Sequence, residues 1–192
     1  MIQALRHIGW TLVVLATLFS RVARADQVSP DKQAVILARA LAYDDNLHAR
    51  AGDTLVIAVL FKAGQGGSES AADGMVRAFK ALEGVKVQNL PLHVIKLAYT
   101  NKDALHSAVG SQGIDAVYVS AGLEGDQGTI RDESKRDHIL TIASREDQLS
   151  SGLSLGVFSY DGKTTIAVNL PASKEEGAAF SSELLRLARV IR

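Results

Sequence analysis

A glycine- and serine-rich turn, KAGQGGSES at residues 62–70, is the part of the sequence best suited to binding a small anion. It follows an apolar run and leads toward a helix, so its backbone N–H groups could face a negative charge. The turn lacks the Gly-Lys-Ser/Thr ending of a P-loop, and Glu69 stands where a dinucleotide-binding turn has its last glycine. Glu69 would also repel a phosphate. We therefore expect a flexible connection here and no nucleotide cofactor.

Ligand pockets of open α/β sheets lie at the carboxyl ends of the strands. We therefore expect a pocket formed by the last residues of the predicted strands and the residues that directly follow them. The candidate pocket residues are Lys62, Gly64, Gly66, Gly67, Ser68, Tyr99, Thr100, Ser120 and Gly122.

The residue types that could carry catalysis do not stand in a catalytic arrangement. Ser120 lies near a strand end, but Tyr118 stands where the G-x-S-x-G elbow of a serine nucleophile has its first glycine. The histidines lack metal-ligand spacing. The acidic residues between 124 and 133 lack the ordered spacing of a calcium loop and fit a solvated loop. We expect a binding protein and not an enzyme, with no metal and no cofactor.

The C-terminal segment AAFSSELLRLARVIR, residues 178–192, predicts a closing helix. Ser181 would cap it and Glu183 would lie in its first turn, where the helix dipole favours an acid. A helical wheel places four residues on one core-facing stripe: Phe180, Leu184, Leu187 and Ile191. Leu185 falls outside that stripe. We therefore expect Leu185, Arg189 and Arg192 to be the residues through which this tail could dock on a partner.

Apolar runs separated by turn residues predict alternating helices and strands. We expect helices at 31–47, 71–82, 101–113 and 145–151, and strands at 54–61, 92–99, 114–122 and 138–144. The run at 54–61 is apolar throughout, which is typical of a parallel strand covered on both faces. Near the end of the chain, Ser173 and Glu176 fit a capping box that starts a short helix, which Gly177 would end. This order predicts a doubly wound, mostly parallel sheet in one α/β domain.

An Asp161-Gly162 pair flanked by strand-like runs predicts an antiparallel hairpin at the C-terminal side of that sheet. With these two residues as the loop, paired residue numbers sum to 323. One face then holds three apolar pairs: Leu153 with Leu170, Leu155 with Val168, and Val157 with Ile166. Because the register sorts the two faces cleanly, we expect it to be the native one. The predicted fold is thus an α/β domain with an antiparallel C-terminal hairpin and a closing C-terminal helix.

The N-terminus predicts export. A basic start is followed by twelve largely apolar residues, Ile8 to Phe19, and the A-x-A pattern places a cleavage site between Ala25 and Asp26. The apolar run is shorter than a membrane span, which needs about 20 residues. We expect a signal peptide at 1–25, a single domain at 26–192, and a periplasmic protein.

The amino-acid composition limits the kinds of partner and chemistry that this protein can have. Without residues 1–25 the chain holds 18 basic and 21 acidic residues, a net charge of −3, which argues against nucleic-acid binding. The chain has no cysteine, so disulfides and thiol chemistry are excluded. The sequence leaves a homodimer open.

The last forty residues resemble the closing segment of the YfiR/HmsC-like (DUF4154) family. The shared residues are Asn169, Leu170, Gly177, Ser181, Ser182, Leu184, Leu185, Leu187 and Ala188. The resemblance implies a small periplasmic α/β protein that binds the periplasmic domain of an inner-membrane diguanylate cyclase, holds it inactive and lowers cyclic-di-GMP signalling and biofilm output. Unlike well-known members, this chain has no cysteine pair and no Trp-Pro stretch after its first helix, so a redox switch is excluded.

Two functions thus stand side by side. The first is a periplasmic regulator of a diguanylate cyclase or another inner-membrane sensor. The second is a periplasmic small-ligand-binding protein that serves a sensor or a transporter.

Overall fold

The computed structural model describes residues 28–192. The expected signal peptide and the cleavage site at Ala25 and Asp26 lie outside the described residues. Within 28–192, no helix is long and apolar enough to cross a membrane.

Eight strands form one sheet in the order β2-β3-β1-β4-β5-β6-β7-β8. Their bounds are Leu55–Lys62 (β1), Lys86–Val87 (β2), Leu90–Tyr99 (β3), Ala116–Val119 (β4), Leu140–Ala143 (β5), Leu155–Tyr160 (β6), Lys163–Asn169 (β7) and Arg189–Ile191 (β8). The β2–β3 and β6–β7 pairs are antiparallel and the other neighbours are parallel. The chain winds from β1 outward to β3 and then back past β1 to β4, which confirms the predicted doubly wound, mostly parallel sheet.

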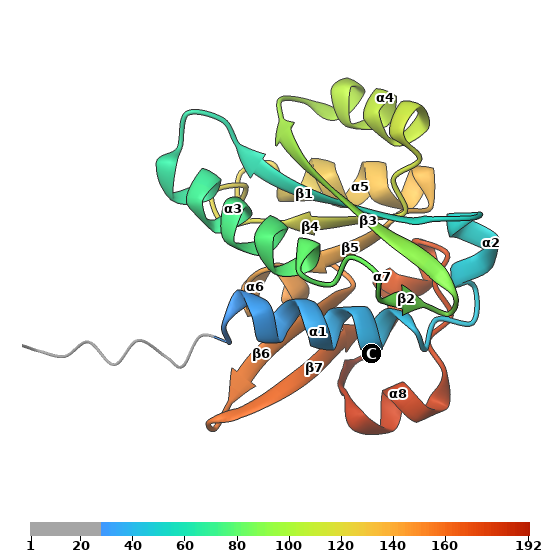
Figure 1. The fold of residues 1–192 in the computed structure, drawn as a ribbon. Helices are drawn as coiled ribbons and strands as arrows, with labels where there is room; N and C mark the ends of the chain where they lie inside the picture. Colours follow the sequence, from blue (N-terminus) through green and yellow to red (C-terminus); the bar gives the residue numbers. More distant parts are fainter. Residues whose placement is uncertain (1–27) are drawn as a thin grey trace, which may run out of the picture.

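Helices cover both faces of this sheet (Figure 1). Their bounds are Pro30–Leu41 (α1), Leu47–Ala51 (α2), Gly66–Lys80 (α3), Lys102–Gln112 (α4), Gln127–Asp137 (α5), Glu146–Ser150 (α6), Leu170–Glu175 (α7) and Ser182–Leu187 (α8). Residues of α1, α3 and α8 share one core cluster, and residues of α4, α5 and α6 share the other. In Figure 1, α1 and α3 lie in front of the sheet and α5 behind it.

β1 shows why its sequence is apolar throughout. Leu55, Ile57 and Val59 belong to the core under α1 and α3, whereas Ala58 and Leu60 belong to the core under α4 and α5. A strand covered on both faces cannot alternate apolar and polar side chains. The predicted central strand is confirmed.

The hairpin has the predicted register, with Leu155 opposite Val168 and Val157 opposite Ile166. Asp161 and Gly162 both have positive φ, 51° and 74°, as the favoured two-residue hairpin turn requires. The third expected pair, Leu153 with Leu170, is wrong. The strand stops at Asn169, whose side chain caps α7 by accepting a hydrogen bond from the amide of Ala172 at 3.2 Å.

Two expected helix boundaries are wrong on the N-terminal side of the sheet. The first helix was expected to run to residue 47 but ends at Leu41, and a separate short helix, α2, begins at Leu47. α3 begins at Gly66 and not at residue 71, so Gly66, Gly67 and Ser68 form its first turn. Glycine tolerates helical dihedrals even though it does not favour them, and tertiary packing decides the boundary.

The expected acidic loop after β4 is also wrong, because α5 occupies residues 127–137. Ile130 is the only large apolar residue of this helix, and it is fully buried. One apolar residue in eleven gives no helical periodicity, so the sequence carries little signal for α5.

The end of the chain departs most from expectation. Gly177 has a φ of 85° and follows α7, and the Ser181 hydroxyl caps α8, as predicted. The proposed capping box is wrong, since Ser173 lies inside α7 and Asn169 caps it. The expected closing helix ends at Leu187, and Arg189–Ile191 form the edge strand β8, parallel to β7.

The wheel assignment of the tail fails for the same reason. Leu184 is buried with 1 % of its surface exposed, but Leu187 is 72 % exposed and not in the core. Leu185, expected outside the apolar stripe, packs partly buried against the core under α1.

Candidate functional site

The candidate pocket residues from the sequence gather where the chain reverses its winding, between the carboxyl ends of β1 and β4. Lys62 ends β1, and its Nζ lies 2.6 Å from Oδ2 of Asp126, the residue before α5. The ion pair joins the loop after β1 to the loop after β4. Ligands of doubly wound sheets bind at this switch point, so the location follows the general rule.

The two loops pack tightly against each other. The Ser68 hydroxyl accepts a hydrogen bond of 2.9 Å from the amide of Lys62, and Ser68 is buried. Gly122 has a φ of 93°, and a Cβ atom on it would lie 2.6 Å from Oε1 of Gln65 and 2.9 Å from Cβ of Ser68. The close approach requires glycine and leaves no room between Gly122 and α3.

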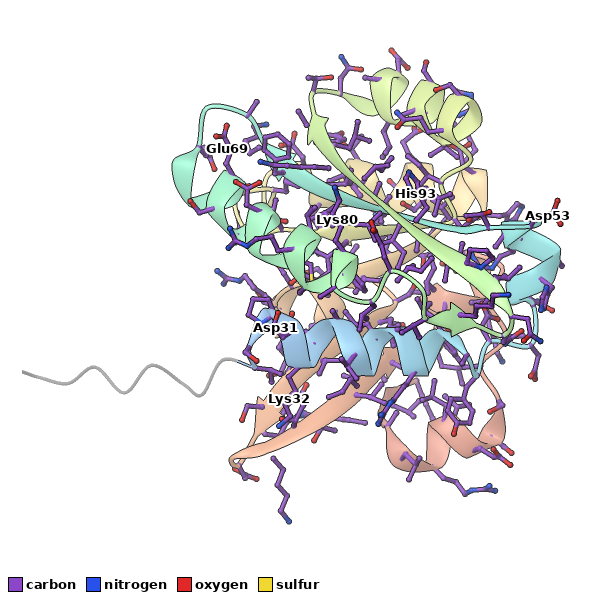
Figure 2. The ribbon with its side chains drawn as sticks, in the orientation of Figure 1. Asp31, Lys32, Asp53, Glu69, Lys80 and His93 are labelled. Carbon is purple, nitrogen blue, oxygen red and sulfur yellow. The ribbon has the colours of Figure 1, made fainter. Side chains whose placement is uncertain are left out.

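The glycines of the turn have mixed environments. The amide of Gly64 donates a hydrogen bond of 3.0 Å to Oε1 of Glu69, which lies in the first turn of α3 (Figure 2). Gly66 and Gly67 are exposed and helical. Since Glu69 already binds the Gly64 amide, an incoming anion would have to displace a carboxylate, and anion binding by this turn stays a prediction.

Tyr99 is the sheet partner of Lys62, Thr100 follows it, and Ser120 directly follows β4. Tyr99 is buried, and burial together with the charges of Asp126 and Glu133 raises the pKa of its phenol. Thr100 is exposed. Ser120 is fully buried, and its hydroxyl has no hydrogen-bond partner among the described residues.

A pocket of about 650 Å³ lies beside this contact, on the side of the sheet that α1 and α3 cover. It lies at the carboxyl ends of β4, β5 and β6. Its lining residues are Val28, Pro30, Gln33, Ala71, Met75, Tyr118, Ala121, Ser144, Arg145, Glu146, Asp147, Val157, Phe158 and Ser159. None of the nine predicted pocket residues lines it, although Ala121 lies between Ser120 and Gly122.

The inner wall of the pocket is mostly apolar, with Met75, Val157 and Phe158 buried. The Tyr118 hydroxyl in this wall donates a hydrogen bond of 3.1 Å to Oε1 of Gln33 on α1. Burial raises the pKa of the Tyr118 phenol, so this group stays a neutral donor.

Charged side chains stand on one wall of the pocket. Arg145 forms two hydrogen bonds of 3.0 Å to Asp147, and these bonds hold the pKa of the Asp147 carboxyl below its usual range. Glu146 is exposed beside them. An apolar interior with a charged wall suits an amphipathic small molecule. Within residues 28–192, no group of three potential ligands could hold a metal ion.

The tail residues proposed for docking have structural roles as well. The guanidinium of Arg189 lies 4.4 Å from the centre of the Tyr160 ring and 3.4 Å from Oε1 of Glu146. Arg192 is exposed. Because Leu185 packs on the core, Leu187 is the exposed leucine of this tail.

A model of the YfiR/HmsC-like (DUF4154) family matches residues 49–189, from α2 to β8. The chain belongs to this family. The match spans the sheet and the C-terminal segment, which confirms the resemblance seen in the last forty residues. Membership of the YfiR/HmsC-like family supports a periplasmic regulatory role. Comparison of the sequence with curated proteins returned no match.

Solved structures share the fold at low sequence identity. The ABC domain in complex with L-Trp from Streptococcus pneumonia has a TM-score of 0.58 at 13 % identity, covering 85 % of this chain and 60 % of its own. A conserved domain protein from Vibrio cholerae has a TM-score of 0.57 at 13 % identity, and the match covers 85 % of this chain and 60 % of that protein. The substrate-binding protein CD0873 from Clostridium difficile has a TM-score of 0.53 at 15 % identity, and the match covers 77 % of this chain and 58 % of that protein. This chain therefore spans about three fifths of the length of each.

Proposed function

We propose that this protein is a periplasmic regulatory binding protein that inhibits the periplasmic domain of an inner-membrane diguanylate cyclase and so lowers cyclic-di-GMP signalling and biofilm formation. The observation that carries the proposal is the family match over residues 49–189. Inhibition by binding needs a folded surface and no reaction chemistry.

The side chains are consistent with a protein that does not catalyse a reaction. Two buried carboxylates hold backbone amides in place: Asp115 accepts a hydrogen bond of 2.8 Å from the amide of Val56, and Glu176 accepts one of 2.8 Å from the amide of Thr141. The unpartnered Ser120 hydroxyl has no hydrogen-bonded base, which a serine nucleophile requires. We infer a binding role.

The sequence predicts a docking surface on the C-terminal segment. It presents Leu187, Arg189 and Arg192, whereas Leu185 supports the helix from inside. Arginine is enriched in protein interfaces, and the buried centre of an interface is depleted of charge and can take an apolar side chain such as Leu187.

Recovery of the partner tests the proposal. The full chain, carrying an affinity tag inserted in the exposed Asp161-Gly162 turn, is expressed in its native host and isolated with solubilised inner membranes. We expect a protein with a diguanylate cyclase domain to copurify, and its cyclase activity to fall when the purified chain is added. Unchanged cyclase activity at a saturating concentration of the purified chain would contradict inhibition.

A second candidate function rests on the 650 Å³ pocket. We propose that the pocket binds a small amphipathic molecule and that the protein serves a sensor or transporter as its ligand carrier. The fold is shared with a substrate-binding protein and with an ABC domain solved in complex with L-Trp. The pocket volume lies within the usual range for small-molecule sites, about 300–1,000 Å³.

Filling the pocket separates the two functions. Ala71 lines the pocket from an exposed position on α3, so Ala71→Trp should block it without disturbing the core. Ser70→Trp, one residue away and outside the lining, is the matched control. If the protein is a ligand carrier, a periplasmic metabolite extract should raise the melting temperature of the Ser70→Trp variant and leave that of the Ala71→Trp variant unchanged. If neither variant responds to the extract, the carrier function is wrong.

A further inference from the structure

A second hollow of the surface, about 240 Å³ in volume, lies between α1 and the segment that joins α3 to β2. We call it the α1 groove. Its lining residues are Val35, Ala38, Arg39, Ala42, Leu82, Val85, Lys86 and Val87. It lies apart from the 650 Å³ pocket, with which it shares no lining residue.

The α1 groove holds one of the exposed large apolar side chains of the described residues. Within residues 28–192, three large apolar side chains are exposed, namely Tyr43 at 37 %, Val85 at 49 % and Leu187 at 72 %. Val85 lines the groove, and Tyr43 follows the lining residue Ala42. Isolated exposed apolar residues are ordinary, whereas Val85 lines a hollow whose other lining residues are mostly apolar, so a partner's side chain can be buried there.

One wall of the groove is a row of apolar residues from α1 and the residue after it. Val35, Ala38 and Ala42 are spaced at three and four residues, so they form one line along two turns of α1. Ala38 and Ala42 are small, which lets another backbone approach α1 closely. A volume of 240 Å³ corresponds to about eight water molecules at roughly 30 Å³ each, which is room for one or two large side chains. Helix-in-groove recognition uses such a few anchoring side chains on one helix face.

The groove is rigidly framed. The side-chain amide of Gln88 donates to the carbonyl oxygens of Ala42 at 3.0 Å and Asp44 at 2.9 Å. These bonds fasten the β2–β3 turn to the end of α1. Val87, at the base of the groove, is 2 % exposed. A partner therefore meets a preformed surface and does not have to order it.

The charged side chains that line the groove have one sign. Arg39 and Lys86 line the groove and are exposed, and the lining contains no acidic residue. Neither forms an ion pair with another described residue. An occupant with carboxylates beside its apolar anchors would match both features.

We propose that the α1 groove receives an amphipathic helix of the membrane partner, whose apolar side chains enter between α1 and residues 82–87 and whose carboxylates pair with Arg39 and Lys86. This inference rests on the proposed function, since it names the surface that holds the cyclase. It assigns the contact to α1 and not to the C-terminal tail.

Site-specific photocrosslinking tests the inference in the native host. A photoreactive phenylalanine, p-benzoylphenylalanine, replaces Val85 in the groove, Leu187 in the tail, or Lys102 on α4 as the control across the sheet. We expect the Val85 variant to crosslink to a diguanylate cyclase, at a periplasmic peptide with apolar residues at helical spacing and flanking acids. The Lys102 variant should not.

Each other outcome overturns the inference. A crosslink to the cyclase from Leu187 alone leaves the proposed function standing and rejects the groove. A crosslink from Val85 to a second copy of this chain shows self-association, and an adduct with lipid shows a membrane contact. If no position crosslinks to a cyclase, the proposed function fails as well.

Charge reversal adds an independent measurement. Arg39→Glu together with Lys86→Glu should lower the Val85 crosslink yield at least about tenfold, the equivalent of roughly 1.4 kcal/mol. The matched control is Lys80→Glu, an exposed lysine at the end of α3 that lies outside the groove lining (Figure 2). An unchanged yield in the double variant would reject the assigned charge complementarity.

Discussion

Glu176 accepts two hydrogen bonds from Thr141: its Oε2 from the amide at 2.8 Å and its Oε1 from the hydroxyl at 2.7 Å. Ser154 also donates its hydroxyl to Oε2. The carboxyl is fully buried and fastens the connection between α7 and α8 to β5 and to the start of β6. Burial raises its pKa to about 7, against the lowering effect of these hydrogen bonds.

We expect Glu176 to make folding stability fall between pH 4.5 and pH 8. The folded pKa of about 7 exceeds the ordinary value of 4.5, so the folded state holds this proton more tightly than the unfolded state does. The stabilisation is complete below pH 4.5 and is lost as the pH rises through 7, by an amount on the order of 3 kcal/mol.

Glu176→Gln tests this dependence, because the amide keeps the shape and does not titrate. Relative to the native chain, the variant should gain stability in urea denaturation as the pH rises from 4.5 to 8. Some pH dependence should remain in the variant, since burial also raises the pKa of Asp115, to about 6. Parallel stability curves for the two proteins would show that Glu176 does not titrate in this range.

Arg50→Ala should destabilise the protein by about 3–5 kcal/mol, because it leaves the Asp44 carboxylate buried without its cation. The Asp44 carboxylate is fully buried and lies 2.5 Å from the Arg50 guanidinium. It also accepts a hydrogen bond of 2.8 Å from the amide of Ala179. Lys96→Ala breaks a more exposed pair with Asp73 and should cost no more than about 1 kcal/mol. Equal losses in chemical denaturation would contradict the assignment of burial.

Leu184→Ala should cost about 2–5 kcal/mol, whereas Leu187→Ala should change the free energy of unfolding by less than about 0.5 kcal/mol. Leu184 is 1 % exposed and Leu187 is 72 % exposed on the same short helix. Urea midpoints of the two variants measure the difference. A large loss for Leu187→Ala would mean that α8 continues as the core helix that the wheel predicts.

Gly122→Ala should destabilise the fold by about 1–3 kcal/mol, through its positive φ and the contact with Gln65 and Ser68. Gly67→Ala is the control, because this helical glycine has open space around it and alanine stabilises a helix by about 0.5–1 kcal/mol. Thermal unfolding of both variants gives the comparison. Two shifts in the same direction would show that the loops after β1 and β4 do not pack as described.

The elements that the sequence predicts well have local causes. β1 is an unbroken apolar run because both of its faces are covered, and the hairpin register follows from Asp161 and Gly162 together with alternating side chains. In both, the residues that decide the structure lie close together in the sequence, so the sequence alone is enough.

The elements that the sequence misses depend on distant contacts. β8 exists because Arg189–Ile191 pair with β7, which is about twenty positions away, and this contact overrides the helical spacing of leucine and arginine. α5 has one apolar anchor, Ile130. The 650 Å³ pocket combines residues from α1 to β6, and only the assembled sheet brings them together.

Intracellular cyclic-di-GMP in a strain that lacks this gene is the most direct test of the proposed function. We predict that its level rises several-fold over the parent strain and returns to the parent level when the full chain is expressed. The same chain without residues 1–25 should fail to restore it, because it would remain in the cytoplasm. An unchanged level of cyclic-di-GMP in the deletion strain would contradict the proposal that this protein restrains a diguanylate cyclase.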